Sequence, residues 1–456
     1  GNYWPVYCLT WLVTIGVGIV FVLTPAMLSH DIFSYAGYGR LQVLYHANPY
    51  FTSLAIFPHD SFRAINDWPG VPSAYGPIWQ MISGVLVPVI GDSPSRAILA
   101  YRSLALVGHL LNVVLIMCIL QALGRSSRTV VSGMLLYAWN PLVLEESVMG
   151  GHNDVLMMTL VLLGLLFSVR NVERGRRLPL RAYLPTLAAL SAAALVKFSA
   201  LPVLWLYFVL LARQAYGGRD GVTVQSPGSR MKAVMLTIVP GGIFCGAVIL
   251  LFYLPYWIGF TIPQIIASFS LLPSSRLSYN SIMSSVVYWE QRNQLPGGNW
   301  LSPILAIFSE HQTWSIISAA VLIGGLGVGA IWIWNSPSTR TVALAGLAAT
   351  GTMLAITPWF YPWYLIWIVG LAAIVLPAGR FERALLAAVL VFSASALCTY
   401  LYINIDSSIG GWKEESFLFV LVPPLLTLLG FWAWPERRRD GESVGDIRNH
   451  RRRYGL

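Results

Sequence analysis

Long apolar runs alternate with short polar segments along nearly the whole chain, from Val6 to Trp434. A bilayer core of about 30 Å needs roughly 20 helical residues to cross it. The pattern therefore predicts about twelve membrane-spanning helices, near residues 6–28, 97–123, 129–145, 153–170, 183–198, 200–214, 233–257, 312–334, 342–357, 360–377, 385–404 and 415–434. The apolar block 183–213 is interrupted at Leu201-Pro202, so we expect two short helices that meet near one surface. The expected fold class is an all-α polytopic membrane protein.

The basic residues predict the orientation of these helices. They cluster between apolar runs at Arg125 and Arg128, 170–181, 213–232, Arg340, Arg380 and Arg383, and 437–453. Under the positive-inside rule all of these segments face the cytoplasm if both termini do. The apolar stretch Pro77 to Ile90 would reverse every later basic segment if it spanned, so we expect it to be re-entrant or interfacial. We predict one transmembrane domain over 1–434 and a basic cytoplasmic tail over 435–456.

Composition supports this class and excludes others. Of the 456 residues, 56% are apolar and 11% charged, whereas a soluble domain has about 25% charged residues. The net charge of +10 follows from topology and does not indicate nucleic-acid binding. The sequence has no D-x-D, H-E-x-x-H or phosphate-binding G-x-x-x-x-G-K-[ST] pattern, and its four cysteines lie inside apolar runs. We therefore expect no metal, no cofactor and no ATP-driven transport.

Polar groups collect in the segments that this topology places outside. These are a long first loop over 29–92, a short loop around 145–153, a large loop over 259–300 and a last loop around 406–415. Function is expected on this outer face.

Asp31 is the candidate general base in the first outer loop. A carboxylate at the point where a helix leaves the membrane is partly desolvated, which raises its basicity and suits it to deprotonate a hydroxyl. The alternative is that Ser29 or Asp31 merely caps an interfacial helix that begins at Ile32.

Two further points on the outer face could bind an anion or a sugar. His152, Asn153 and Asp154 precede a span whose N-terminus lies outside, where they could bind hydroxyls or phosphate, or simply cap the helix. Lys197 lies at the outer end of an apolar run, where a cation needs an anionic partner or must snorkel to water. A lipid phosphate could be that partner.

The large outer loop contributes Arg276 and Asn280, and a later hairpin contributes Tyr361 and Trp363. Aromatic faces suit sugars, although an aromatic belt at the membrane surface explains any single ring equally well.

The polar motifs together resemble the GT-C superfamily of membrane glycosyltransferases. Within it, the chain is most similar to the polyprenol-phosphate-mannose-dependent mannosyltransferases of actinobacterial lipoglycan synthesis. The motifs, in order, are His30-Asp31-Ile32-Phe33-Ser34-Tyr35, Gly39-Arg40, Asn48-Pro49-Tyr50, Tyr75-Gly76-Pro77, Gly151-His152-Asn153-Asp154, Lys197 before Pro202, and Tyr361-Pro362-Trp363-Tyr364.

The resemblance implies a GT-C-type bundle with interfacial helices in the first outer loop. It also implies an inverting transfer of a hexose, with mannose as the expected sugar, from a polyprenyl-phosphate donor to a lipid-linked or glycan acceptor. Asp31 would then be the general base, and Lys197 would hold the leaving phosphate. The other motif residues, including His30, Tyr35, Arg40, Tyr50 and Tyr75, would contribute to substrate binding. The enzyme would act at the outer face of a bacterial plasma membrane.

Two other classes of function stay open from the sequence. A lipid or small-molecule transporter would place ionisable groups and broken helices near the bilayer midplane, and often shows internal repeats. A non-catalytic membrane subunit would use the first outer loop to bind a partner, and would tolerate replacement of Asp31 and Lys197.

Overall fold

The computed structural model describes residues 3–172, 180–217, 226–269, 278–293, 302–375, 379–404 and 412–433. The long helices are α1 (Trp4–Leu23), α4 (Pro94–Ala122), α7 (Asp154–Val172), α8 (Leu180–Val196), α9 (Leu201–Gly217), α10 (Pro227–Trp257), α14 (His311–Asn335), α15 (Thr339–Ile356), α17 (Arg380–Asn404) and α18 (Trp412–Ala433). Shorter ones are α2 (Asp31–Val43), α3 (Pro77–Ile90), α5 (Ser127–Ala138), α6 (Pro141–Leu144), α11 (Ile262–Phe269), α12 (Ile282–Asn293), α13 (Ser302–Ser309) and α16 (Leu365–Val375). Within the described ranges no strand forms, and one isolated bridge pairs Tyr279 with Trp359.

Helices occur at all twelve positions predicted to span the membrane, which confirms the all-α polytopic class. Eight helices in the described ranges are long and apolar enough to cross a bilayer, so the protein is an integral membrane protein. Leu184–Val196, Pro362–Val375 and Leu418–Phe431 are apolar but shorter, and the count of twelve spans stays a prediction.

The predicted span 129–145 is not one continuous helix. It breaks between α5 and α6, where the Asn140 side chain caps the new helix by accepting a hydrogen bond from the Val143 amide at 3.2 Å. Pro141 follows at the first helical position, where its missing N–H is not needed.

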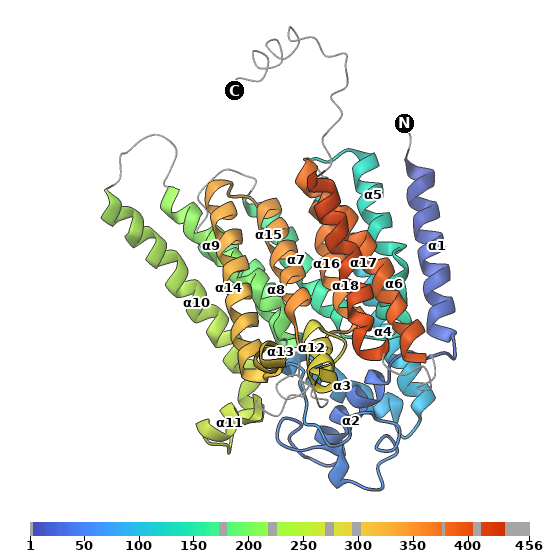
Figure 1. The fold of residues 1–456 in the computed structure, drawn as a ribbon. Helices are drawn as coiled ribbons and strands as arrows, with labels where there is room; N and C mark the ends of the chain where they lie inside the picture. Colours follow the sequence, from blue (N-terminus) through green and yellow to red (C-terminus); the bar gives the residue numbers. More distant parts are fainter. Residues whose placement is uncertain are drawn as a thin grey trace.

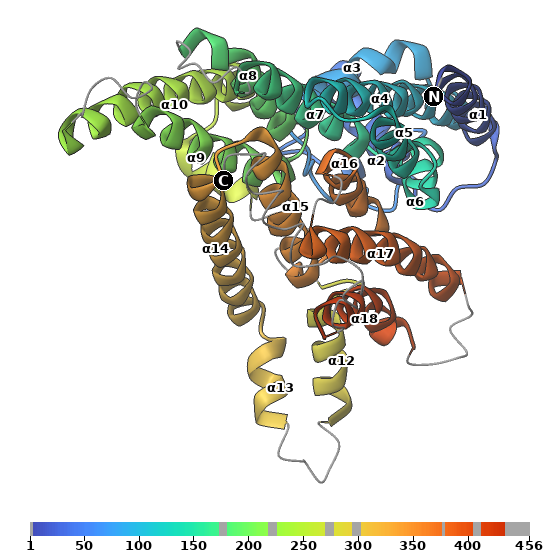
Figure 2. The same cartoon turned by 90° about the horizontal axis from the view of Figure 1, so that it is seen from above.

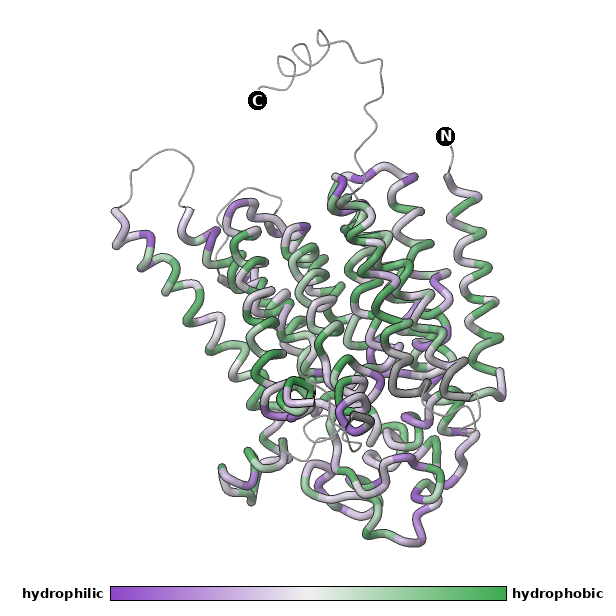
Figure 3. The backbone as a smooth tube through the Cα atoms, in the orientation of Figure 1, coloured by the Kyte–Doolittle hydropathy of each residue, from purple (hydrophilic) through white to green (hydrophobic). Residues whose placement is uncertain are grey.

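The long helices lie side by side as a bundle, and the segment that contains α2 and α3 covers one end of it (Figure 1). α1 begins and α18 ends at the opposite end of the bundle. Figure 3 shows hydrophobic positions along the bundle and hydrophilic ones concentrated towards its two ends. Seen from above, α12 and α13 project from one side of the bundle (Figure 2). The start of α1 and the end of α18 thus lie at the same end of the bundle, while which end is cytoplasmic stays a prediction.

The helix over Pro77–Ile90 has the bounds of the predicted re-entrant or interfacial segment. Its 14 residues extend about 21 Å, less than a bilayer core. Met81, Val85 and Val89 are exposed, whereas Trp79 and Val87 are buried. One apolar face therefore remains available to lipid while the other packs in the protein.

Two segments that were predicted to be outer loops contain more helix than the sequence suggested. In the predicted loop 145–153, residues Glu145–Met149 form a π-helix that continues α6. The predicted loop 259–300 contains α11 and α12. Polar composition suggested loops there, but both segments retain enough apolar positions to pack or to face lipid as helices.

Arg40 binds parts of the segment 29–92 to one another and does not line a cavity. Its guanidinium contacts Asp60 Oδ2 at 2.7 Å, the carbonyl oxygen of Gly91 at 2.7 Å and Asp92 Oδ1 at 2.8 Å. These contacts tie α2 to the following loop and to the end of α3. The structure thus gives the predicted substrate-binding Arg40 a scaffold position.

Gly76 lets the segment 29–92 approach the bundle closely. Its amide donates to the carbonyl oxygen of Val196 at 3.1 Å. A Cβ atom at this position would lie 2.0 Å from the carbonyl oxygen of Leu195, which is backbone and cannot rotate away. The Tyr75-Gly76-Pro77 motif therefore has a steric reason: only glycine allows this contact two residues from Lys197.

We expect Gly76→Ala to lower the stability of the purified protein by about 1–3 kcal/mol, because the added methyl group overpacks a backbone contact. The thermal unfolding midpoint in detergent, followed by tryptophan fluorescence, measures this. Gly70→Ala is the matched control, since a Cβ there meets nothing within 4 Å. Equal midpoints for the two variants would contradict the close contact.

Candidate functional site

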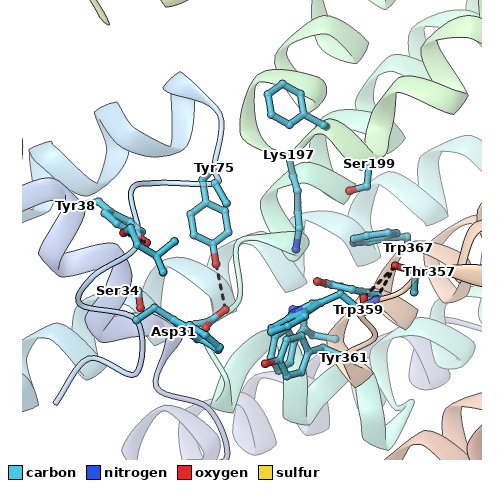
Figure 4. Close-up of a pocket in the computed structure, with 16 residues that line it drawn as sticks. Asp31, Ser34, Tyr38, Tyr75, Lys197, Ser199, Thr357, Trp359, Tyr361 and Trp367 are labelled. Carbon is cyan, nitrogen blue, oxygen red and sulfur yellow. Dashed lines mark hydrogen bonds between the residues drawn. The ribbon is translucent and has the colours of Figure 1, made fainter. Parts of the chain in front are cut away.

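A cavity of about 300 Å³ lies where the segment 29–92 meets the bundle. Its wall comes from four stretches far apart in sequence, and Figure 4 shows their side chains converging on one space. The lining residues are Asp31, Ser34, Tyr38, Trp68, Val71, Ala74, Tyr75, Lys197, Phe198, Ser199, Thr357, Trp359, Tyr361, Trp363, Tyr364 and Trp367. The cavity thus brings together a carboxylate, a lysine ammonium and nine aromatic rings.

Asp31 is the first residue of α2 and opens onto this cavity, with 15% of its side chain exposed. Tyr75 donates its hydroxyl to Asp31 Oδ2 at 3.2 Å, and Tyr35 donates to the same oxygen at 3.4 Å. His152 Nδ1 lies 3.7 Å from Oδ2 as well. The helix-cap alternative is met only in part, because the Ser29 hydroxyl accepts from the Asp31 amide at 3.3 Å while the Asp31 carboxylate points to the cavity.

The expectation that desolvation raises the basicity of Asp31 is wrong in its net direction. Burial does raise the pKa of Asp31, but the neighbouring charges of His152 and Lys197 and the hydroxyl of Tyr75 stabilise the carboxylate more, so that the pKa lies below its ordinary value. Asp31 is therefore a weaker base than the sequence argument suggested, and one that is ionised throughout the neutral range.

His152 is buried between two carboxylates. Its Nε2 lies 3.4 Å from Glu146 Oε2, and its Nδ1 faces Asp31. Burial opposes a charge on the imidazole, but the two carboxylates outweigh it and raise the pKa of His152 to about 9. Trp363 stacks on the ring with a centroid distance of 4.0 Å, which favours a cation over its face. His152 is thus an imidazolium at neutral pH.

The backbone before α7 is shaped to hold this ring. Gly151 has φ +65°, a left-handed conformation that other residues rarely adopt. A Cβ at Gly150 would lie 2.6 Å from the His152 imidazole. The Gly150-Gly151 pair therefore provides both the turn and the space for the ring.

Lys197 lies at the break between α8 and α9, where the chain becomes extended for one residue. The break falls at Lys197, a few residues before the predicted Leu201-Pro202, because Pro202 is tolerated in the first turn of α9. The ammonium contacts Asp154 Oδ1 and Oδ2 at 2.8 and 3.0 Å, and Trp367 Nε1 donates to Oδ1 at 2.6 Å. The partner of Lys197 is thus a buried carboxylate, and snorkelling is not needed.

Some of the aromatic rings in the cavity wall are covered by neighbouring rings. Trp363 is stacked between His152 and Tyr361, at centroid distances of 4.0 and 4.1 Å. Both of its faces are therefore occupied, so Trp363 cannot stack on a sugar as its motif suggested. Trp68 and Trp359 meet edge to face at 5.7 Å further along the cavity wall.

Several predicted residues lie behind the cavity wall or away from it. His30 is exposed and pairs with Asp67 at 2.9 Å. Tyr50 packs on Tyr253 and Tyr256, outside the lining. Asn153 is fully buried beside the site, and in the described ranges its amide finds no hydrogen-bond partner. Asn280 is buried next to the Tyr279–Trp359 bridge with φ +45°. Arg276 lies outside the described residues.

Sequence reasoning missed Glu146 and the lining residues Tyr38, Trp68, Phe198 and Trp367. Glu146 belonged to a predicted loop, and no nearby motif marked it. Tyr364 and Trp367 carry the Lys197 ammonium over their faces at 4.7 and 5.3 Å, a role that the spacing on α16 could not reveal without the position of α8. The described residues contain no group of three or more side chains suited to a metal ion, and independence from metal stays a prediction.

The polar residues of this site fall within a segment that matches a known protein family. Residues 9–213 match the family model described as alpha-(1->6)-mannopyranosyltransferase, N-terminal domain, a range that contains Asp31, Glu146, His152, Asp154 and Lys197. The predicted resemblance to mannosyltransferases is confirmed.

Individual relatives agree with this match. A probable alpha-(1->6)-mannopyranosyltransferase of Mycolicibacterium smegmatis is 29% identical over 162 residues, which cover 34% of this chain and 28% of the relative. An alpha-(1->6)-mannopyranosyltransferase of Mycobacterium tuberculosis is 24% identical over 399 residues, which cover 81% of this chain and 66% of the relative. The chain thus spans less than two thirds of the length of each.

A solved structure with a similar helical arrangement is ArnT from Cupriavidus metallidurans bound to undecaprenyl phosphate. It is 13% identical to this chain, with a TM-score of 0.47 over 94% of this chain and 76% of the other.

The buried imidazolium predicts a pH dependence of stability. Because the pKa of His152 is raised on folding, its stabilisation is complete below about pH 6.5, falls as the pH rises towards 9, and amounts to about 3 kcal/mol in total. We expect the thermal midpoint to fall over this interval. His152→Gln should flatten the profile, whereas His30→Gln should keep it. A flat profile for the parent protein would contradict the charged imidazole.

Proposed function

We propose that the protein transfers a mannosyl group from a polyprenyl-phosphate donor to a hydroxyl of a lipid-linked or glycan acceptor, with inversion, at the outer membrane face. The observation that carries the proposal is the convergence of Asp31 and Lys197 on one aromatic cavity, although 166 positions separate them in the sequence. A base and a cation on opposite sides of a sugar are what an in-line transfer from phosphate requires.

The contacts of Asp31 suggest which of its oxygens acts. In the described ranges, Tyr35, Tyr75 and His152 all approach Oδ2. Oδ1 is left for a substrate, so in this proposal it accepts the proton of the attacking hydroxyl while the acceptor oxygen forms its bond to the anomeric carbon. The lowered pKa of Asp31 guarantees the ionised form, and the mild basicity suffices because the sugar–phosphate bond is already breaking in an oxocarbenium-like transition state.

Lys197 serves the leaving group. Two of its three N–H donors point to Asp154, which leaves one donor and an exposed fraction of 17% towards the cavity. When the bond from the anomeric carbon to the phosphate oxygen breaks, that phosphate gains a negative charge. The ammonium, desolvated between Tyr364 and Trp367, is placed to stabilise that charge.

Protons and charges balance in the proposed step. The acceptor hydroxyl gives its proton to Asp31, the sugar passes to the acceptor oxygen, and the bonding electrons stay on the phosphate. One negative charge therefore leaves the carboxylate and one appears on the phosphate, so no further acid, metal or cofactor is needed to balance the reaction.

Asp31→Asn should reduce mannosyl transfer by at least about 100-fold, because the amide has the size of the carboxylate but cannot take a proton. The assay follows radiolabelled mannose from polyprenyl-phosphate mannose into a membrane lipid extract, with purified protein and a chelator present. Asp67→Asn, which removes an exposed carboxylate of the same outer segment, is the control. Retained turnover in Asp31→Asn would refute the base assignment.

A failure of the parent protein with mannose, glucose and arabinose donors, in spite of an intact fold and varied acceptors, would instead refute the transfer itself. It would favour the transporter or the non-catalytic subunit.

Lys197→Met should lower turnover by about 100- to 1000-fold through loss of phosphate stabilisation. It also leaves Asp154 buried without its cation, which destabilises the fold. The double variant Lys197→Met with Asp154→Asn separates these effects, since it removes the uncompensated charge. We expect its thermal midpoint to recover while transfer stays low. Recovery of transfer in the double variant would show that Lys197 only maintains the fold.

A further inference from the structure

Glu146 is a buried acid that lies behind the cavity rather than in its wall. Its side chain is 2% exposed, and its Oε1 accepts a hydrogen bond from the Tyr400 hydroxyl at 2.5 Å. Its other oxygen faces His152 Nε2 at 3.4 Å. A buried carboxylate is expensive unless it is paired, and the described surroundings supply His152 as its cation.

The backbone at Glu146 is unusual in a way that aims this side chain. Residues Glu145–Met149 form a π-helix, in which one extra residue per turn shifts the direction of the side chains relative to the preceding α6. The Arg102 guanidinium, itself buried, donates to the carbonyl oxygen of Met149 at 2.6 Å and holds the end of this segment. Glu146 is thereby turned into the bundle towards His152, whereas its neighbour Glu145 makes no ion contact with His152.

The imidazole joins Glu146 to the proposed base. Asp31 faces one ring nitrogen and Glu146 the other, and Trp363 covers one face of the ring. If Asp31 were the only carboxylate beside the ring, His152 would lose the stabilisation of its proton each time Asp31 accepted one. With a second carboxylate behind the ring, the positive charge stays on His152 whether Asp31 is ionised or has just accepted a proton.

We propose that Glu146 is a positioning residue that holds His152 as an imidazolium against Asp31 Oδ2, so that the carboxylate stays in place with Oδ1 towards the acceptor hydroxyl. The role in turnover rests on the proposed mannosyl transfer, while the charge on His152 does not. After transfer, the protonated Asp31 lies beside a fixed cation, which favours release of its proton to solvent and resets the base. The imidazolium makes Asp31 a weaker base, but it keeps the carboxylate ionised and in place.

The charged and titratable groups around His152 come from several elements. Asp31 belongs to α2 with Tyr35, and Tyr75 donates to the same carboxylate. Glu145 and Glu146 belong to the π-helix, and Tyr400 reaches Glu146 from α17. The Lys197–Asp154 pair lies beyond Asp31 and acts on it through space. Among these, neutralising Glu146 removes a charge that touches His152 without altering the cavity wall.

Glu146→Gln is the test, because the amide keeps the size of the side chain and can still accept from Tyr400. Without the second carboxylate, His152 should lose its proton at a lower pH. A neutral His152 no longer fixes the Asp31 carboxylate, so we expect transfer at pH 8 to fall about tenfold or more relative to the parent, and to return to near the parental rate at pH 6. The decline of the thermal midpoint should also begin at a lower pH, with no substrate present.

Glu145→Gln is the matched control: its transfer profile should follow the parent, and above pH 7 the decline of its thermal midpoint should do so as well. Glu146→Asp keeps the charge and should keep the parental shape of the pH profile even if the rate drops, which also covers the case in which Glu146→Gln does not fold. A merely structural Glu146 would lower activity equally at every pH.

The two proposals fail in different ways. Parental pH profiles in Glu146→Gln, together with active parent protein, would overturn the role of Glu146. A shifted stability profile in Glu146→Gln, with no transfer by any form of the protein, would uphold the Glu146–His152 pair and overturn the transfer.

Discussion

The ion pair between Lys197 and Asp154 fixes the geometry on which the cavity depends. Asp154 is the first residue of α7 and is fully buried, so its carboxylate lies at the positive end of a helix dipole and needs a cation as well. Lys197 supplies that cation from the break after α8, and Trp367 of α16 donates to the same carboxylate. Three helices are thus held at one point. The wall that Lys197, Tyr364 and Trp367 form follows from this single arrangement.

The net charge of the site and its substrates stays the same through the proposed reaction. Asp31, Glu146 and Asp154 are balanced by His152 and Lys197, which leaves one excess negative charge around the cavity. In the proposed step that charge moves from Asp31 to the phosphate, while both cations stay where they are. A dry site tolerates such a migration much better than the creation of a new charge, because the fixed partners need not reorganise.

The sequence allowed the helices and the main site residues to be predicted, but not the links between them. Apolar runs located the long helices to within about six residues, since membrane spans have a strong and local signal, whereas α11 and α12 lay in a predicted loop. Asp31 and Lys197 stood out because charged side chains are rare beside apolar runs. Glu146 did not stand out, because its place beside the site depends on a π-helix and on the contact with His152, which only tertiary structure creates. The net direction of the Asp31 pKa could not be predicted for the same reason: desolvation is visible in a sequence, but the three partners that outweigh it are not.

The positions of the chain breaks explain why a site forms at this level of the bundle. Asp31, the turn at Gly150-Gly151, the extended residue Lys197 and the segment 357–364 are all places where a helix starts or stops. Backbone that is not helical is tolerated at membrane depth only where protein or water satisfies its polar groups. Grouping the breaks around one cavity brings their polar backbone and side-chain groups together, as where the Gly76 amide donates to the carbonyl oxygen of Val196 next to Lys197. The same grouping brings residues more than a hundred positions apart into contact, so the polar groups that the breaks need become the groups that can act on a substrate.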